Sequence, residues 1–194
     1  MNISVIGFGG MGKNVVSIAK ERGHNIVSII DQSVSEATHT QVTAEAIGNA
    51  DVVIDFSSRE AVLQNIELVG SLGINMIEGT TGWYDEMETV KNIVGKYSTG
   101  FLWSGNFSVG VNLYLKVVEY ASHLFNNYPE YDIWGHEIHH AGKADSPSGT
   151  AKLLENILLD NLDRKTSVVE DKLDRKINSN EIHFSSTRGG QVNF

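Results

Sequence analysis

A glycine pattern directly after the first apolar run constrains the fold of this chain more than any other feature. Residues 3–6 are apolar, and residues 7–12 follow with the spacing Gly-x-Gly-x-x-Gly. Residues 12–20 then place apolar side chains at helical spacing, and residues 25–30 have the composition of a second buried strand. Strand, tight turn, helix and strand form a βαβ unit of about thirty residues.

The same alternation continues along the chain. Short apolar runs bounded by glycine or polar residues predict further strands, and longer stretches with apolar side chains on one face predict helices. Alternating strands and helices with short connections are typical of a doubly wound parallel sheet in a Rossmann-like α/β domain. The predicted strands are 51–56, 75–78 and 100–103, and the predicted helices are 59–72, which Gly73 ends, and 86–97.

The pattern changes after residue 107. A long amphipathic helix is predicted over 109–125, a second helix over 151–162 and a strand over 180–188, whereas 163–180 is charged and is expected to be partly exposed. We therefore predict a Rossmann-like domain over 1–108 and a smaller α+β domain over 109–194.

Composition excludes several classes of function. The chain has 24 acidic and 15 basic residues in 194, a formal charge of −9, and no basic stripe, so nucleic acid is not an expected partner. It has no cysteine, which rules out disulfides and thiolate metal sites and agrees with a reducing cytoplasm. It has no secretory leader and no apolar run of about 20 residues, so no membrane association is expected.

The glycine pattern also predicts a ligand. In a strand–turn–helix context the three glycines permit a tight turn, a close approach of the backbone to pyrophosphate and close helix packing, while the helix start attracts phosphate. Asp31 follows Gly12 by nineteen residues, where a carboxylate binds the adenosine ribose. Because a carboxylate repels a 2′-phosphate and residues 32–38 contain no basic group, NADH is favoured over NADPH. The alternatives are a mere tight turn and an aspartate that caps a turn.

Titratable residues are densest between residues 134 and 151. His139 and His140 suit proton transfer near neutral pH, and Lys143 could neutralise a carboxylate. Residues 146–151 resemble a helix start, with a serine cap and a proline tolerated in the first turn, and its free N–H groups form an anion site. Adjacent residues of a strand face opposite ways, so only one histidine can point at a given atom. The alternative is a surface loop with two unrelated histidines.

A metal site is a further alternative for this stretch. Glu137, His139, His140 and Asp145 have the chemistry of metal ligands. Their spacing matches no closed zinc pattern, and hydride transfer from nicotinamide needs no metal. We therefore predict no metal.

With these residues in view, the chain resembles the dihydrodipicolinate reductase family, enzymes of lysine and diaminopimelate biosynthesis. The resemblance is strongest over Glu137–Ala151, which reads Glu-Ile-His-His-Ala-Gly-Lys-Ala-Asp-Ser-Pro-Ser-Gly-Thr-Ala. It extends in order from residue 1 to about residue 192, through the glycine loop and the segments 53–57, 79–82 and 104–112.

The resemblance implies an activity and residue roles. The activity is reduction of 4-hydroxy-tetrahydrodipicolinate to tetrahydrodipicolinate by NADH or NADPH: hydride goes to the ring of a cyclic imine dicarboxylate, His139 protonates the neighbouring carbon, and water is lost. Lys143 is implied as second proton donor and carboxylate ligand, and His140, Gly149 and Thr150 as substrate contacts. A homotetramer is implied for the full-length enzyme, with the second domain binding substrate and mediating assembly. The predicted cofactor contacts are Gly7, Phe8, Gly9, Gly10, Met11, Gly12, Asp31, Gly79, Thr80, Thr81, Ser104, Gly105, Asn106 and Phe107.

Three features depart from the family pattern. Gly10 stands where many members carry a basic residue, which further weakens contact with a 2′-phosphate. Ala141 and Gly142 replace bulkier residues before Lys143, so this lysine is expected to be held less rigidly. The family continues beyond Arg188-Gly-Gly into further sheet and a final helix, so the chain resembles a C-terminally shortened member.

Two other functions fit the residues without the resemblance. Another two-domain NAD-dependent dehydrogenase, acting on an amino acid or a sugar, would share the glycine loop. A dinucleotide-binding module without catalysis would bind NADH, and its function would not depend on His139 or Lys143.

Overall fold

The computed structural model describes residues 1–191. It divides the chain into two compact units, of which the first spans Met1–Gly105 and the second begins at Asn106. The domain boundary that we predicted, between residues 108 and 109, lies three residues beyond this division. Residues 192–194 of the predicted second domain lie outside the described residues.

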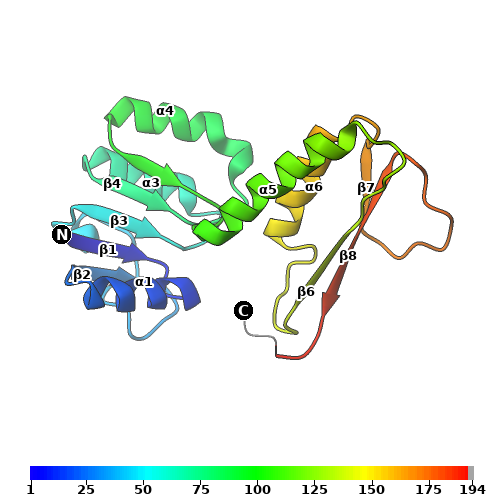
Figure 1. Cartoon of the computed structure of the whole chain (residues 1–194). Helices are drawn as coiled ribbons and strands as arrows, with labels where there is room; N and C mark the ends of the chain where they lie inside the picture. The colour runs from blue at the N-terminus through cyan, green and yellow to red at the C-terminus, as the bar shows by residue number, and fades with distance from the viewer. Residues whose placement is uncertain (192–194) are drawn as a thin grey trace. The chain divides into compact units, whose positions relative to one another are not determined.

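The first unit is a five-stranded parallel sheet with the strand order β2-β1-β3-β4-β5 (Figure 1). The chain runs from β1 to one edge of the sheet, and then returns past β1 to build the other side. Parallel sheets with such a reversal bind ligands at the carboxyl ends of the strands beside it. The elements are β1 (Asn2–Ile6), α1 (Gly10–Glu21), β2 (Asn25–Ile30), α2 (Ala44–Ile47), β3 (Val52–Asp55), α3 (Val62–Ser71), β4 (Asn75–Glu78), the 3₁₀ turn η1 (Tyr84–Glu86), α4 (Met87–Tyr97) and β5 (Phe101–Trp103).

Helices cover both faces of this sheet. Val5 of β1 packs in one buried cluster with Val16 of α1. Val53 of β3 belongs to a separate cluster with Ile66 of α3 and Val90 of α4. The two apolar clusters, one on each face, confirm the predicted doubly wound sheet.

Several element boundaries in this unit differ from the predictions. The helix predicted from residue 59 begins at Val62, because a turn precedes it in which the Ala61 N–H donates to the Ser58 carbonyl at 3.0 Å. The helix predicted from residue 86 begins at Met87, after the 3₁₀ turn. Helix α2 was not predicted, because four residues are too few to show a helical period.

The second unit packs two helices and a three-stranded sheet around a small core. Its strand order is β6-β8-β7, and both pairings are parallel. Leu158 and Leu162, at the end of α6, pack with Ile182 of β8, and Val118 of α5 and Val168 of β7 lie against this cluster. The elements are α5 (Val109–Asn126), β6 (Gly135–His139), α6 (Gly149–Asn161), β7 (Ser167–Val169) and β8 (Glu181–Arg188).

The start of α6 and the strand β7 correct two predictions. The helix predicted from Ala151 begins at Gly149, and the Oγ atom of Ser148 caps it by accepting from the Ala151 N–H at 3.1 Å. Pro147 therefore precedes the cap and does not lie in the first turn. Strand β7 lies in the stretch where no element was predicted, and its three residues are too short to show alternation.

Candidate functional site

The glycine loop between β1 and α1 depends on the absence of side chains at two positions. Gly7 has a φ of 82°, and a Cβ there would lie 2.3 Å from the Phe56 carbonyl oxygen. A Cβ on Gly12 would lie 1.9 Å from the Gly7 carbonyl oxygen. Gly9 and Gly10, in contrast, face open space, with nothing within 4 Å of an added Cβ. The loop therefore packs tightly at its two ends, and its middle leaves room for a ligand to approach the backbone.

Asp31 lies directly after β2, and its carboxylate turns toward this loop. Its Oδ2 atom accepts from the Phe8 N–H at 2.8 Å, and its Oδ1 atom accepts from the Ser33 N–H at 2.8 Å. These two hydrogen bonds, that from Phe8 first, lower the pKa of Asp31 below its usual value. The carboxylate is therefore ionised at neutral pH and acts only as an acceptor. Each oxygen keeps a lone pair that a hydroxyl could use.

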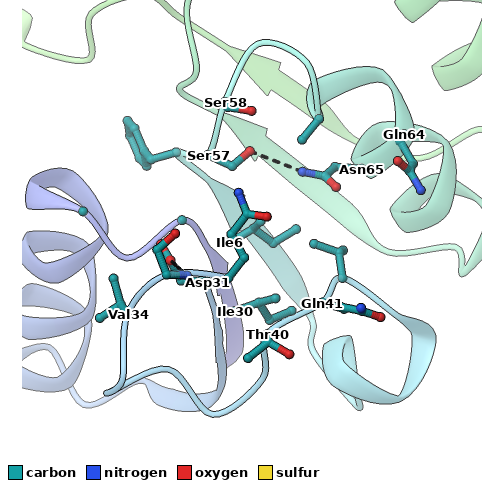
Figure 2. Close-up of a pocket in the computed structure, with 17 residues that line it drawn as sticks. Ile6, Ile30, Asp31, Val34, Thr40, Gln41, Ser57, Ser58, Gln64 and Asn65 are labelled. Atoms are coloured by element: carbon teal, nitrogen blue, oxygen red, sulfur yellow. Dashed lines mark hydrogen bonds between the residues drawn. The ribbon is translucent and has the colours of Figure 1, made fainter.

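A cavity of ≈ 580 Å³ opens at the carboxyl ends of β1, β2 and β3. Figure 2 shows Asp31 and the loop after β2 on one side and Ser57 and Ser58, which follow β3, on the other. Gly7 and Gly9 form part of its wall. The cavity lies where the strand order reverses, and the open glycine backbone and ionised carboxylate fit the phosphate and ribose of a dinucleotide. The other predicted cofactor residues do not line it.

The later predicted cofactor segments follow β4 and β5, which are neighbours in the sheet. A Cβ on Gly105 would lie 2.6 Å from the Tyr84 hydroxyl and 3.8 Å from Thr81 Cγ2, so the two turns meet at this edge. Gly79 makes room for the Phe56 ring, which would lie 2.1 Å from an added Cβ. The structure thus brings Thr81 and Gly105 together within the first unit.

The end of the first sheet also holds two buried carboxyl groups. Asp55 of β3 and Glu78 of β4 are register partners, and both are fully buried. Asp55 accepts from the Ser57 N–H and from Asn65 Nδ2, each at 2.7 Å. Glu78 Oε1 accepts from the Thr80 N–H at 2.7 Å, whereas Glu78 Oε2 has no hydrogen-bond partner among residues 1–191. Burial, and then the charge of Asp55, raise the pKa of Glu78 to about 8.

In the second unit, the two predicted histidines lie at the end of β6. His139 is the last residue of the strand, its side chain is half-buried, and it is in register with Arg188 of β8. His140 lies beyond the strand and is exposed. Because side chains alternate along a strand, His139 shares its face with Glu137. Of the two histidines, His139 is therefore the one whose side chain lies partly buried beside Glu137.

Glu137 is the centre of a polar network that the sequence did not reveal. Its carboxylate accepts from the Ser148 N–H at 2.9 Å, from Ser148 Oγ, from Ser186 Oγ at 2.9 Å and from Arg188 Nη2 at 2.8 Å. His139 Nδ1 lies 3.5 Å from Glu137 Oε2. Burial acts to raise the pKa of Glu137, but the hydrogen bonds from Ser148, Arg188 and Ser186 together lower it to about 2.

Lys143 lies in the loop between β6 and α6. Its Nζ atom is 2.7 Å from Asp145 Oδ1, and its N–H donates to the His140 carbonyl at 3.1 Å. Hydrogen bonding from Lys143 is the largest of the effects that lower the pKa of Asp145, and the Gly149 N–H at the start of α6 contributes as well. Lys143 and the helix start therefore already hold one carboxylate between them.

Some functional features escaped sequence reasoning. Within residues 1–191 the structure shows no group of three or more His, Cys, Asp or Glu side chains placed to hold a metal ion. Lys13 of α1 is a basic residue outside the stretch 32–38, and its Nζ atom lies 3.5 Å from Glu36 Oε1. Ser57 and Ser58 could have been found, because they follow a predicted strand at the reversal of strand order. Unpredicted polar residues also line the cavity: Gln32, Ser33, Thr40, Gln41, Gln64 and Asn65.

The fold defines a class: an α/β protein in which a Rossmann-like unit with a cavity at its glycine loop is followed by a small unit that groups histidine, lysine and carboxylate side chains. The profile of "Dihydrodipicolinate reductase, N-terminus" matches residues 1–107, and that of "Dihydrodipicolinate reductase, C-terminus" matches residues 110–193. The chain belongs to the dihydrodipicolinate reductase family, which indicates a nicotinamide dinucleotide as its cofactor.

The chain is also similar to individual named reductases. A 4-hydroxy-tetrahydrodipicolinate reductase of Christiangramia forsetii is 35% identical over 82% of this chain and 64% of its own length. One from Natronomonas pharaonis is 36% identical over 81% of this chain and 65% of its own length. The dipicolinate-bound dihydrodipicolinate reductase of Paenisporosarcina sp. TG-14 matches with a TM-score of 0.70 at 20% identity, over 98% of this chain and 79% of that structure. The chain thus spans about two thirds of these two sequence relatives. Its described part contains no helix long and apolar enough to cross a membrane.

Proposed function

We propose that this chain carries out the NADH-dependent reduction of 4-hydroxy-tetrahydrodipicolinate to tetrahydrodipicolinate. When bound, the reduced nicotinamide supplies the hydride. The family assignment and the named relatives support the reaction. The observation that carries the proposal is the cluster in the second unit, where Lys143 and the start of α6 hold a carboxylate and His139 lies at the end of the adjacent strand.

The residues of this cluster take separate roles in the proposal. Lys143, His140 and the N–H groups of Gly149 and Thr150 bind the substrate carboxylates, for which the contacts of Asp145 are the internal precedent. His139 gives a proton to the carbon next to the one that receives hydride, and Lys143 is the second proton donor. Loss of the 4-hydroxyl group as water comes first, because it creates the C=C bond, conjugated with the imine, that takes hydride on one carbon and the proton on the next. Preorganised donors at such a site are commonly worth a few kcal/mol each in the transition state.

Most of the proposed cofactor contacts lie at the two places described in the first unit, and Asn106 and Phe107 are the first residues of the second unit. We assign the adenosine ribose to Asp31 and the pyrophosphate to the loop Gly7–Gly12, and we place the nicotinamide half near Gly79–Thr81 and Ser104–Phe107. The ionised Asp31 carboxylate supports NADH over NADPH, because it accepts from a ribose hydroxyl and repels a 2′-phosphate. Lys13, the nearby cation, is paired with Glu36.

A coupled assay tests the reaction. The synthase of the preceding step makes the substrate from pyruvate and aspartate semialdehyde. The 194-residue chain is then added, and oxidation of NADH is followed by its absorbance. We expect substrate-dependent oxidation that is faster with NADH than with NADPH. Absence of any substrate-dependent signal with both cofactors would overturn the proposal.

A variant tests the cofactor choice separately. Asp31→Ser removes the negative charge and keeps a hydroxyl, so the ratio of NADPH to NADH affinity is expected to rise at least about tenfold, or ~1.4 kcal/mol. Glu21→Gln, an exposed position at the end of α1, is the matched control for loss of one charge. An unchanged ratio in Asp31→Ser would show that Asp31 does not contact the ribose.

We further propose that the full-length protein acts in the cytoplasm as a homotetramer. Exposed apolar side chains in the second unit support assembly: Trp134 is 75% exposed and Ile138 is 50% exposed. The absence of cysteine from the sequence is in keeping with a reducing compartment. Sedimentation at several concentrations measures the assembly, and a single monomeric species would contradict it.

A further inference from the structure

One carboxylate in the second unit contacts the His139 imidazole and the cap of α6, and its partner Arg188 reaches the loop of Lys143. We infer that Glu137 and Arg188 are positioning residues, which together hold the His139 imidazole, the first turn of α6 and the loop of Lys143 in one arrangement. The inference deepens the proposed function and rests on it. Neither residue is required to touch the substrate.

Glu137 joins three elements through its two oxygens. Oε1 accepts from the Ser148 N–H at the α6 cap, and from Ser186 Oγ and Arg188 Nη2 of β8. Oε2 accepts from Ser148 Oγ and lies 3.5 Å from His139 Nδ1 on the same strand. An ionised carboxylate has about four lone-pair sites, so these donors use almost its full capacity. The cap that orients the α6 N–H groups thus depends on the same side chain that lies beside the imidazole of His139.

Arg188 extends the arrangement to the lysine loop. Its Nη2 atom donates to Glu137 Oε1 at 2.8 Å and to the Asp145 carbonyl at 2.6 Å. The Asp145 side chain in turn pairs with Lys143. A continuous path of contacts therefore runs from Lys143 through Asp145, Arg188 and Glu137 to His139.

Low exposure makes this pair stronger than an ordinary surface ion pair. The Arg188 and Glu137 side chains are 16% and 10% exposed, whereas the Lys143 and Asp145 side chains of the same path are 26% and 56% exposed. Charge-assisted hydrogen bonds are strong where water is largely excluded, and exposed pairs contribute little. The Glu137–Arg188 contact is therefore the rigid part of the path.

The contact between Glu137 and Arg188 also depends on the chemical type of each side chain. Gln in place of Glu137 would present an NH₂ group where one of the donors now points, leaving the guanidinium without its counter-charge. Nη2 of Arg188 makes both contacts, and Nη1 anchors the guanidinium by donating to the Thr187 carbonyl at 3.0 Å. Lys in place of Arg188 keeps the charge but lacks this planar anchor, so it holds Glu137 and the Asp145 carbonyl less rigidly. Misplacement of a reacting group by about 1 Å can cost about 100-fold in rate.

The experiment compares the 194-residue chain with Glu137→Gln, Arg188→Lys and Arg188→Ala in the coupled assay. Arg175→Ala is the matched control, because Arg175 pairs with Glu181 of the same sheet by two contacts of 2.8 Å outside the network. We expect kcat/KM for the dicarboxylate to fall about 100-fold in Glu137→Gln and Arg188→Ala, and about tenfold in Arg188→Lys. NADH affinity is expected to stay within about twofold, because the proposed dinucleotide contacts lie mainly in the first unit.

Chemical rescue separates positioning from folding. Guanidinium chloride, far below the concentrations that unfold the protein, is expected to restore part of the lost kcat/KM in Arg188→Ala but not in Glu137→Gln, with sodium chloride as the ionic-strength control. Wild-type kcat/KM in both Glu137→Gln and Arg188→Lys would overturn the inference. The inference would also be overturned if kcat/KM fell only in proportion to melting temperature and NADH affinity, and guanidinium restored none of it. An inactive wild-type chain would instead overturn the proposed function, and the inference with it.

Discussion

Raising the pH through the neutral range is expected to destabilise the first unit, and Glu78→Gln is expected to abolish this effect. Asp55 and Glu78 are buried side by side, and burial raises the pKa of both carboxyl groups. Hydrogen bonds from Ser57 and Asn65 act against this rise on Asp55. The proton of the pair therefore resides on Glu78, whose pKa is raised from 4.5 to about 8.

The sign and size follow from linkage between protonation and folding. Below pH 4.5 Glu78 is protonated in both the folded and the unfolded chain, so it has no effect on stability. Between 4.5 and about 8 the unfolded chain ionises while the folded one keeps its proton, so the free energy of unfolding falls by about 1.4 kcal/mol per pH unit. Above about 8 both states are ionised and the loss is complete. The upper bound is about 5 kcal/mol, and water entering the opened pair reduces it.

Urea unfolding between about pH 5.5 and about pH 8 measures the slope. Trp134 is replaced by Phe in every variant, so that Trp83 and Trp103 report on the first unit alone. We expect Glu78→Gln to have a nearly flat profile and to be more stable than the parent at the upper pH. Glu88→Gln, whose parent side chain is 83% exposed on α4, is the control and is expected to keep the parental slope. A Glu78→Gln slope equal to that of the parent would refute the reasoning.

Three further predictions concern the loops. Gly7→Ala is expected to destabilise the first unit by more than about 2 kcal/mol, because a Cβ would lie 2.3 Å from the Phe56 carbonyl oxygen at a positive φ; an unchanged urea midpoint would contradict it. Ser148→Ala is expected to cost about 1–2 kcal/mol by loss of the α6 cap, measured by thermal unfolding, whereas Ser148→Thr is expected to retain most of it. Asp145→Asn is expected to tighten dipicolinate binding up to about fivefold in calorimetry. The Asp145 carboxylate competes with the ligand for Lys143, and because its side chain is 56% exposed the gain is small. Weaker binding would show that Asp145 helps to hold the ligand.

The sequence was sufficient to predict those elements whose pattern involves residues close together in the chain. The glycine spacing, the apolar period and Ser148 as a candidate cap each involve residues close together in the chain, and the five strands of the first sheet lie where the pattern predicts them. Strand β7 and helix α2 escaped because three or four residues show no period. In these short elements, packing against the rest of the unit outweighs local preference.

The candidate sites also divide into features that a local pattern predicts and features that depend on contacts between distant residues. The position of Asp31 beside the glycine loop could be predicted, because its distance from Gly12 along the chain is characteristic of a dinucleotide site. The role of Glu137 could not be predicted, because its partner Arg188 is 51 residues away and the register between β6 and β8 brings them together. A sequence read alone shows which groups are available, and strand register decides which of them touch.

The strand order of the second sheet has a consequence for how the protein is made. β8 is the last of the three strands to be synthesised, yet it is the central one, and neither β6 nor β7 pairs with any other described strand. Pairing β6 with β8 requires a long loop to close before the contacts between the strands can form. The entropy lost in closing this loop slows folding. A nascent chain leaving the ribosome therefore carries His139 and Lys143 unassembled until residue 188 has emerged. The first unit, whose strands all lie upstream, can already be folded by then.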